Sequence, residues 1–140
     1  MIMLYSGTPG SGKSLHTARD IRDALRLRKM PVIANFDINH GTRNYGKLFT
    51  FRPNDLLTPE WLTEYATSYW KGRKVREDEI LLVVDEAQLV FNSRSWNAKS
   101  RKDWIEFLSQ PRHYGYKIIL IAQFDRMIAV SYTHLTLPTT

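Results

Sequence analysis

Residues 7–14 read GTPGSGKS, and this stretch decides which fold the chain is expected to adopt. It matches the pattern G-x-x-x-x-G-K-[ST] at every fixed position. A short apolar segment, Met1–Ser6, precedes it and is typical of a buried strand, whereas an amphipathic helical pattern begins at Ser14. A glycine-rich turn between a strand and a helix is the setting in which this motif holds phosphate, so we predict a nucleotide-binding α/β fold.

The glycine-rich turn and the residues directly after it are assigned to the nucleotide. Glycine has no Cβ, so the backbone can approach phosphate oxygens and direct successive N–H groups at them. Lys13 is expected to act as a catalytic positive charge at the β- and γ-phosphates, and the Ser14 hydroxyl to ligate the bridging Mg²⁺. The predicted cofactors are ATP and Mg²⁺, and ATP is favoured over GTP because an N-K-x-D run is absent. The predicted nucleotide-binding residues are Gly7, Thr8, Pro9, Gly10, Ser11, Gly12, Lys13, Ser14 and Leu15.

Two adjacent carboxylates, Asp85 and Glu86, follow a continuous aliphatic segment, Ile80–Val84. Asp85 stands where a second metal-site residue would orient water on Mg²⁺. Glu86 can polarise a water molecule for in-line attack on the γ-phosphate, a role that hydrolases need. The alternative is that both acids only complement the positive end of the helix that they begin. Beside a phosphate-binding loop we favour the catalytic interpretation.

Gln123 follows a second aliphatic segment, Ile118–Ala122, and is a catalytic candidate that would sense the γ-phosphate. In a parallel sheet, ligands gather at the carboxyl ends of the strands, and Gly7, Asp85 and Gln123 all fall at such ends. We therefore expect three separate stretches to meet at one site. The candidates for an arginine that completes the site are Arg94, Arg101 and Arg112. Each of these arginines is more simply explained as a surface residue.

The remaining pattern predicts a three-layer sandwich. Aliphatic strands without polar alternation, separated by amphipathic helices, indicate a mostly parallel sheet covered on both faces. The helices are expected to begin at Ser14, at Pro59 with Thr58 as the cap, and after a Ser100 cap, the last ending near Gln110. Further strands are expected at Val32–Asn35 and Lys47–Phe51.

The helix after Thr58 carries Trp61, Tyr65 and Tyr69 four residues apart, followed by the basic run Lys71–Arg76. Such a surface could stack nucleic-acid bases. Core packing is the interpretation that we favour, because amphipathic helices routinely bury stripes of this kind.

The composition limits the classes of function. A chain of 140 residues, 43% of them hydrophobic, is long enough for one domain with its own core. The net charge of +6 favours anionic partners without choosing among nucleotides, nucleic acid and a lipid surface. The absence of cysteine excludes disulfides and thiol nucleophiles, and the four histidines lack metal-ligand spacing. The sequence shows neither a cleavable leader nor an apolar run that could span a membrane.

The end of the chain differs in character from the rest. Residues 129–140, AVSYTHLTLPTT, carry no charged residue and no helical or strand period. The run VSYTHLTLPT resembles the translation of a transposase adapter used to prepare sequencing libraries. We therefore expect an ATPase domain at residues 1–128 that is truncated at its C-terminus, followed by a non-native tail at residues 129–140. The alternative is an ordinary polar extension.

Four stretches together resemble the zonular occludens toxin-like family, which comprises phage-encoded P-loop ATPases related to the filamentous-phage assembly motor. They are LYSGTPGSGKSLH, VIANFDI, LLVVDEAQLVFNSR and RHYGYKIILIAQFDRMI. The resemblance covers residues 1–128 and implies a P-loop fold of the additional-strand, catalytic-glutamate type. In that fold the strand before Gln123 lies between the strands before Gly7 and Asp85. Relatives commonly have histidine at the position of Pro111, which puts a role for Arg112 in doubt.

The resemblance also implies a function. It supports the roles assigned to Lys13, Ser14, Asp85, Glu86 and Gln123 in a Mg²⁺-dependent ATPase. Such a domain faces the cytoplasm, forms a homo-oligomer and drives extrusion or assembly of phage DNA and coat. Membrane attachment, to the inner membrane, would come only through a C-terminal region that this chain lacks. Two alternatives stay open: a DNA helicase or translocase of another P-loop lineage, because DEAQ is similar to helicase boxes, and a nucleotide-dependent scaffold that does not hydrolyse.

Overall fold

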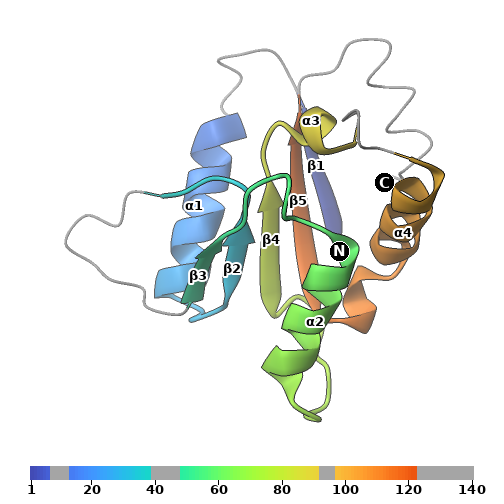
Figure 1. The fold of residues 1–140 in the computed structure, drawn as a ribbon. Coiled ribbons are helices and arrows are strands. Elements are labelled where there is room, and N and C mark those ends of the chain that lie inside the picture. The colour runs from blue at the N-terminus through green and yellow to red at the C-terminus, as the bar shows by residue number, and fades with distance from the viewer. Residues whose placement is uncertain (7–12, 39–47, 92–96, 123–140) are drawn as a thin grey trace.

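The computed structural model describes residues 1–6, 13–38, 48–91 and 97–122, and of residues 6 and 13–15 it describes the backbone only. Predictions for residues 7–12, for Arg94, for Gln123 and for the tail at 129–140 therefore lie outside the described residues. The described elements, drawn in Figure 1, are β1 (Ile2–Ser6), α1 (Lys13–Arg26), β2 (Val32–Ala34), β3 (Phe49–Phe51), α2 (Pro59–Trp70), β4 (Ile80–Val84), α3 (Ala87–Phe91), α4 (Ala98–Ser109), the 3-10 helix η2 (Pro111–His113) and β5 (Tyr116–Ala122).

The described strands form one parallel sheet in the order β1-β5-β4-β2-β3. β5, which precedes Gln123, lies between β1 and β4. The strand order implied by the family resemblance is therefore confirmed, and each described strand pair is parallel, in line with the mostly parallel sheet expected.

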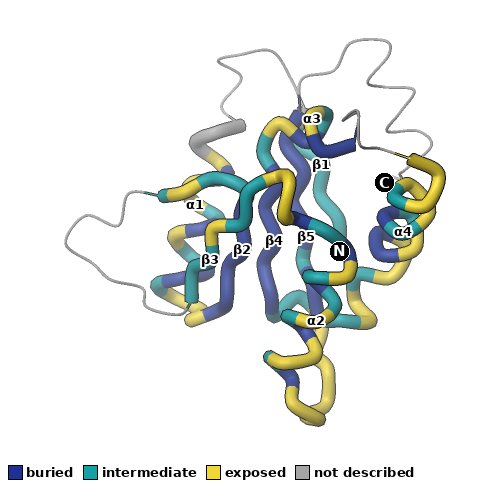
Figure 2. Tube along the Cα trace, viewed as in Figure 1, coloured by how far each residue is buried: buried dark blue, intermediate teal, exposed yellow. Residues whose placement is uncertain are grey.

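Helices cover both faces of this sheet, with α1 on one face and α2 and α4 on the other (Figure 1). β5 shows why its sequence lacks polar alternation. Ile118 and Leu120 belong to a core shared with α2, α3 and α4, whereas Ile119 and Ile121 belong to a second core shared with α1. The middle strands are consequently buried, and the edge strands β1 and β3 are less so (Figure 2). The predicted three-layer sandwich is confirmed.

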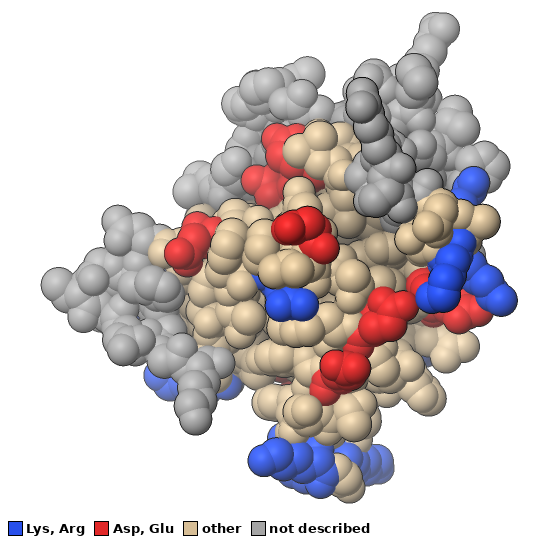
Figure 3. Space-filling view, viewed as in Figure 1, with Lys and Arg blue, Asp and Glu red and all other residues tan. Residues whose placement is uncertain are grey.

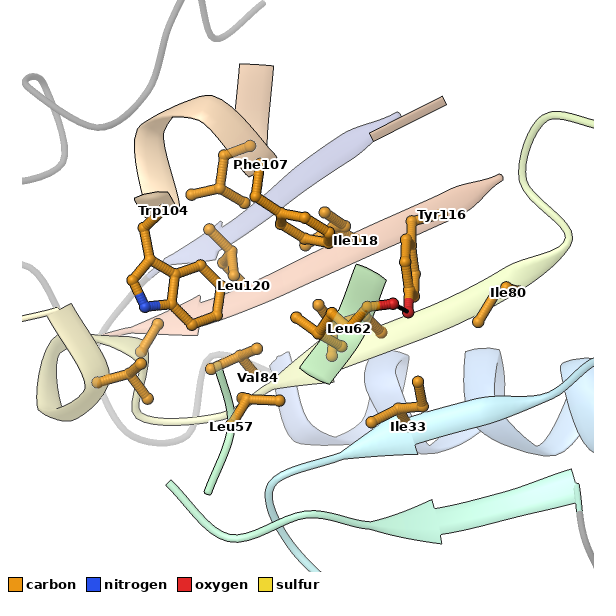
Figure 4. Packing of buried hydrophobic residues seen from close by; sticks show 14 of the residues in the cluster. Ile33, Leu57, Leu62, Ile80, Val84, Trp104, Phe107, Tyr116, Ile118 and Leu120 are labelled. Atoms are coloured by element: carbon orange, nitrogen blue, oxygen red, sulfur yellow. Dashed lines mark hydrogen bonds between the residues drawn. The ribbon is translucent and has the colours of Figure 1, made fainter. Parts of the chain in front are cut away.

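The core under α2 and α4 is rich in aromatic residues (Figure 4). The hydroxyl of Tyr116, at the beginning of β5, donates a hydrogen bond of 2.6 Å to the backbone oxygen of Leu62 in α2. Trp61, Tyr65 and Tyr69 pack partly buried against this core, so the core-packing interpretation of that stripe is confirmed.

Two predicted helix starts have different outcomes. Thr58 caps α2, because its Oγ1 accepts a hydrogen bond of 3.2 Å from the N–H of Trp61, as expected. The prediction that Ser100 caps α4 is wrong: Asn97 has the extended backbone of a cap, and its Oδ1 accepts from the Ser100 N–H at 2.8 Å. Of the helices that the structure describes, none has the length and apolarity needed to cross a membrane.

Candidate functional site

Strands that are distant in sequence end at one edge of the sheet. β1 ends at Ser6 opposite Ala122 of β5, and β4 ends at Val84 opposite Leu120 of β5. Because all these strands are parallel, the chain leaves each of them at the same edge. Residues 7, 85 and 123 directly follow these strand ends in the sequence, and of the three only Asp85 is described, so their meeting at one site stays a prediction.

The amino end of α1 lies at the same edge (Figure 1). The helix begins at Lys13, so the backbone of Lys13 and Ser14 forms its first turn, and no acidic residue occurs there. The first N–H groups of a helix have no partner within it, and the helix dipole adds partial positive charge at this end. The backbone here is therefore arranged to receive an anion.

One side chain, from the residue that follows the neighbouring strand β2, binds both the N–H and the carbonyl of Asp85. Asn35 follows β2, and its Oδ1 accepts a hydrogen bond of 2.8 Å from the Asp85 N–H. The Nδ2 group of the same side chain donates to the Asp85 carbonyl oxygen at 2.9 Å and to Oδ1 of Asn54 at 2.7 Å. The carboxyl end of β4 is thus fixed by side-chain contacts beyond the last ladder pair.

Glu86 adopts a left-handed backbone conformation, with φ of 47°. Its N–H donates to Oδ1 of Asp85 at 2.8 Å, and its carbonyl accepts from the Leu89 N–H at 2.8 Å. The Glu86 carboxylate accepts a hydrogen bond from the side-chain amide of Gln88. Because Glu86 is exposed, water can reach this carboxylate.

α3 anchors the corner formed by Asp85 and Glu86. Ala87, Val90 and Phe91 are buried in the core under α4, so this short helix cannot shift without disturbing that core. The hydrogen bonds described for the two carboxylates go to the Glu86 N–H and to the Gln88 side chain, and none goes to a backbone N–H of α3. Within the described part of the chain, neither acid therefore caps α3 through a hydrogen bond.

Sequence reasoning missed three residues at this corner: Asn35, Asn54 and Gln88. Asn35 carried a usable signal, because it is a polar residue directly after an apolar strand, the same signal that singled out Asp85. It was instead assigned to the strand itself, which the structure ends at Ala34. Asn54 lies in a turn, and nothing in its neighbourhood in the sequence indicates a contact with β2.

The described arginine candidates lie on the surface. Arg101 is exposed on α4. Arg112 is exposed in η2, near the amino end of β5, and its guanidinium lies 3.7 Å from the Glu77 carboxylate. It therefore lies at the edge of the sheet opposite the candidate site, which agrees with the simpler interpretation. Arg94 lies outside the described residues.

The charged side chains on one face fall into separate groups (Figure 3). The basic run Lys71–Arg76 follows α2 at the amino edge of the sheet, far from the strand ends described above. A groove of about 710 Å³ between α2 and α4 is acidic. Two of its four acids, Glu60 and Asp103, lie 3.7 and 2.9 Å from the ammonium group of Lys99. Neither feature borders the candidate site.

Comparison with known proteins gives a family match over almost the whole chain. The family model described as Zonular occludens toxin (Zot) matches residues 1–129. The Gene 1 protein of Enterobacteria phage M13 is 27% identical over 125 residues, which cover 87% of this chain and 36% of that protein. The Gene 1 protein of Escherichia phage If1 is 28% identical over 126 residues, covering 87% and 35%. The chain therefore spans about a third of the length of these curated relatives.

Three solved structures share the fold. The N-terminal domain of zonular occludens toxin from Neisseria meningitidis has a TM-score of 0.50 and 24% identity, over 87% of this chain and 65% of that one. The DNA-packaging ATPase B204 from Sulfolobus Turreted Icosahedral Virus has a TM-score of 0.59 and 21% identity, over 87% and 65%. The genome packaging NTPase B204 from Sulfolobus turreted icosahedral virus 2, in complex with ATP-gammaS, has a TM-score of 0.57 and 19% identity, over 96% and 71%. At these identities the likeness is one of fold.

Proposed function

The chain belongs to the zonular occludens toxin family, and we propose that it is the ATP-binding and ATP-hydrolysing domain of a phage or prophage assembly or export motor. The observation that carries the proposal is the shared edge of the sheet. The strand before GTPGSGKS and the strand before Asp85 and Glu86 flank β5 there. A triphosphate held by the motif would extend its γ-phosphate toward these carboxylates. The similar packaging NTPase is in complex with ATP-gammaS, which supports nucleotide binding by this fold.

The nucleotide is held by residues 7–15 in this proposal. Backbone N–H groups of the glycine-rich turn and of the first turn of α1 receive the phosphates, because they have no partners within the helix. The Lys13 ammonium neutralises charge that develops on the β- and γ-phosphates during transfer.

Ser14 and Asp85 would hold Mg²⁺, and their chemistry fits that ion. Mg²⁺ prefers oxygen ligands and usually takes only one or two protein carboxylates, the rest of its shell being water and substrate phosphate. The described residues contain no cluster of three acids, histidines or cysteines that could hold a metal alone. One oxygen of Asp85 accepts from the Glu86 N–H, which leaves the other for the shell of the ion. When bound, the ion would supply positive charge that stabilises the phosphate oxygens.

Glu86 acts as the general base in this proposal. Its exposed carboxylate can accept a proton from the attacking water, and the hydrogen bond from Gln88 restricts the directions in which it points. Gln123 directly follows β5, the strand between β1 and β4, and would contact the γ-phosphate there. Release of the γ-phosphate would remove that contact and so change the surroundings of the end of β5.

The proposed partners extend beyond the nucleotide. We propose a homo-oligomer in which a neighbouring subunit supplies the arginine that this site lacks within the described residues. The proposed load is phage DNA and coat or assembly proteins, in line with the phage origin of the Gene 1 relatives and with the DNA-packaging ATPase that shares the fold. The domain would face the cytoplasm, with any attachment to the inner membrane provided by another part of the full-length protein.

Phosphate release by the purified full-length protein tests the proposal. We expect hydrolysis of ATP that requires Mg²⁺ and falls at least about a hundredfold in Lys13→Ala, which also weakens ATP binding. Glu77→Gln is the matched control, because Glu77 is an exposed acid paired with Arg112 at the opposite edge, and it should hydrolyse like the wild type. Tight ATP binding by an oligomer without phosphate release would replace the motor with a scaffold. Hydrolysis unchanged in Lys13→Ala would refute the assigned site.

A further inference from the structure

We propose that Asn35 is a positioning residue that holds the Asp85–Glu86 corner in its working geometry, and that Asn54 helps to orient Asn35. The inference rests on the proposed function, because it takes Glu86 as the base. The observation is a single side-chain amide that binds both backbone groups of Asp85 and one further side chain.

The Asn35 side chain binds the chain after β4 at the point where strand pairing between β2 and β4 ends. The last register pair is Ala34 with Val83. One residue later, the Asn35 nitrogen lies 3.4 Å from the Val83 carbonyl oxygen, which is long for a backbone hydrogen bond. The two side-chain bonds to Asp85, at 2.8 and 2.9 Å, have ordinary lengths. On its β2 side, the residue after β4 is thus held by the Asn35 side chain, whereas on its other side Val84 still pairs with Leu120 of β5.

Fixing Asp85 also fixes Glu86. The Asp85 carbonyl and the Glu86 N–H belong to one peptide unit, and that unit is held on one side by Asn35 and on the other by the Asp85 carboxylate. Glu86 itself stands in the left-handed region, which a residue with a Cβ adopts only where its surroundings impose it. Without Asn35 one of these constraints is lost, and the Glu86 carboxylate would sample other directions.

Asn54 adds to the contacts with the Asp85 backbone that fix which way the Asn35 amide faces. Nδ2 of Asn35 has two hydrogens, and the two acceptors present are the Asp85 carbonyl and Oδ1 of Asn54. A reversed amide would place its oxygen against both acceptors and its NH₂ against the Asp85 N–H. Asn54 is itself held in place, because its carbonyl accepts from the N–H of Leu57, which is 2% exposed.

The substitutions that test this arrangement differ in which hydrogen bonds they remove. Asn35→Ala removes the acceptor and both donors, whereas Asn35→Asp keeps the acceptor for the Asp85 N–H but sets an anion against two oxygens. Asn54→Ala removes the acceptor that orients Asn35, and Asn54→Asp restores one. Tyr116→Phe serves as the control for a purely structural loss, since it removes a buried hydrogen bond at the far end of β5.

Steady-state ATP hydrolysis by the full-length protein, together with ATP binding and thermal unfolding, is the first test. We expect kcat to fall at least tenfold in Asn35→Ala and Asn35→Asp, with KM and the ATP dissociation constant changed less than twofold. Asn54→Ala should lose part of kcat and Asn54→Asp should regain it. Tyr116→Phe should lower the unfolding temperature with kcat unchanged. An unchanged kcat in Asn35→Ala, or the same kcat loss in Tyr116→Phe, would overturn the inference.

Hydrogen exchange of the Asp85 amide is the second test and needs no turnover. In the wild type this N–H is bound to Asn35 Oδ1, so its exchange should be slow, and in Asn35→Ala it should be at least tenfold faster. The Val83 amide, within the strand, should be unaffected. Equal exchange rates of the Asp85 amide in the two proteins would overturn the inference that Asn35 holds Asp85. A wild type that does not hydrolyse ATP would instead refute the proposed function, and the exchange result would still decide the role of Asn35 in holding Asp85.

Discussion

Replacing Glu86 by glycine should give a protein that is more stable than its alanine counterpart and equally inactive. Both variants lose the carboxylate and its hydrogen bond with Gln88, so these losses cancel in the comparison. They differ in the backbone, because φ at this position is 47°. A residue with a Cβ is strained there, whereas glycine is not.

Two backbone contributions determine the difference in the free energy of unfolding between Glu86→Gly and Glu86→Ala. The left-handed conformation costs a residue with a Cβ roughly 1–2 kcal/mol. Against this, glycine loses roughly 0.4–1 kcal/mol more conformational entropy than alanine on folding. The net advantage of Glu86→Gly over Glu86→Ala is therefore about 1 kcal/mol. For a domain of this size that difference corresponds to a shift of roughly 4 °C in unfolding temperature.

Thermal unfolding followed by circular dichroism measures this difference, and phosphate release measures the activity. We expect Glu86→Gly to unfold about 4 °C above Glu86→Ala, with hydrolysis in both reduced by roughly 10²–10⁴-fold. A residue that destabilises its own backbone while serving the reaction is common at functional sites. Equal unfolding temperatures for the two variants would refute the strained conformation of Glu86.

Further predictions concern the packing of the core at the amino edge of the sheet. Gly115 has φ of 81°, and a Cβ there would lie 2.6 Å from Cζ2 of the buried Trp70, so Gly115→Ala should cost about 3 kcal/mol or more. Gly72→Ala is its matched control, because Gly72 has φ of 79° with nothing within 4 Å, and should cost only about 1 kcal/mol in urea unfolding. Burial raises the pKa of the Tyr116 hydroxyl above its ordinary value of 10.0, so the folded form keeps the proton that the unfolded form loses. The contribution of Tyr116 is therefore complete below pH 10.0 and lost as the pH rises further, and Tyr116→Phe should show a shallower loss of stability above pH 10.0. The same slope in both proteins would contradict this assignment.

Much of the fold could be predicted because its determinants are local. Ile80–Val84 and Ile118–Ala122 are aliphatic throughout, and the structure shows both flanked by helices on two faces. Thr58 followed by proline marks a helix start by its own chemistry, and it caps α2. The order of the strands was a different matter: it came from the family resemblance, since no local pattern states which strands become neighbours.

The missed features depend on contacts between distant segments or on competing local choices. Asn35 and Asp85 are 50 residues apart, and no periodicity links them. The left-handed conformation of Glu86 was invisible because glycine, its usual signal, is absent. Asn97 and Ser100 are both good caps three residues apart, and the helix begins after the first of them.

ATP binding and phosphate release by the full-length Glu86→Gln protein, measured side by side with the wild type, test whether Glu86 is the base of an ATPase. Glutamine keeps the size of the side chain and can still bond to Gln88, but it cannot accept a proton from water. We expect an ATP dissociation constant within about twofold of the wild type and hydrolysis slower by roughly 10²–10⁴-fold. Hydrolysis at the wild-type rate would contradict the assignment of Glu86 as the general base.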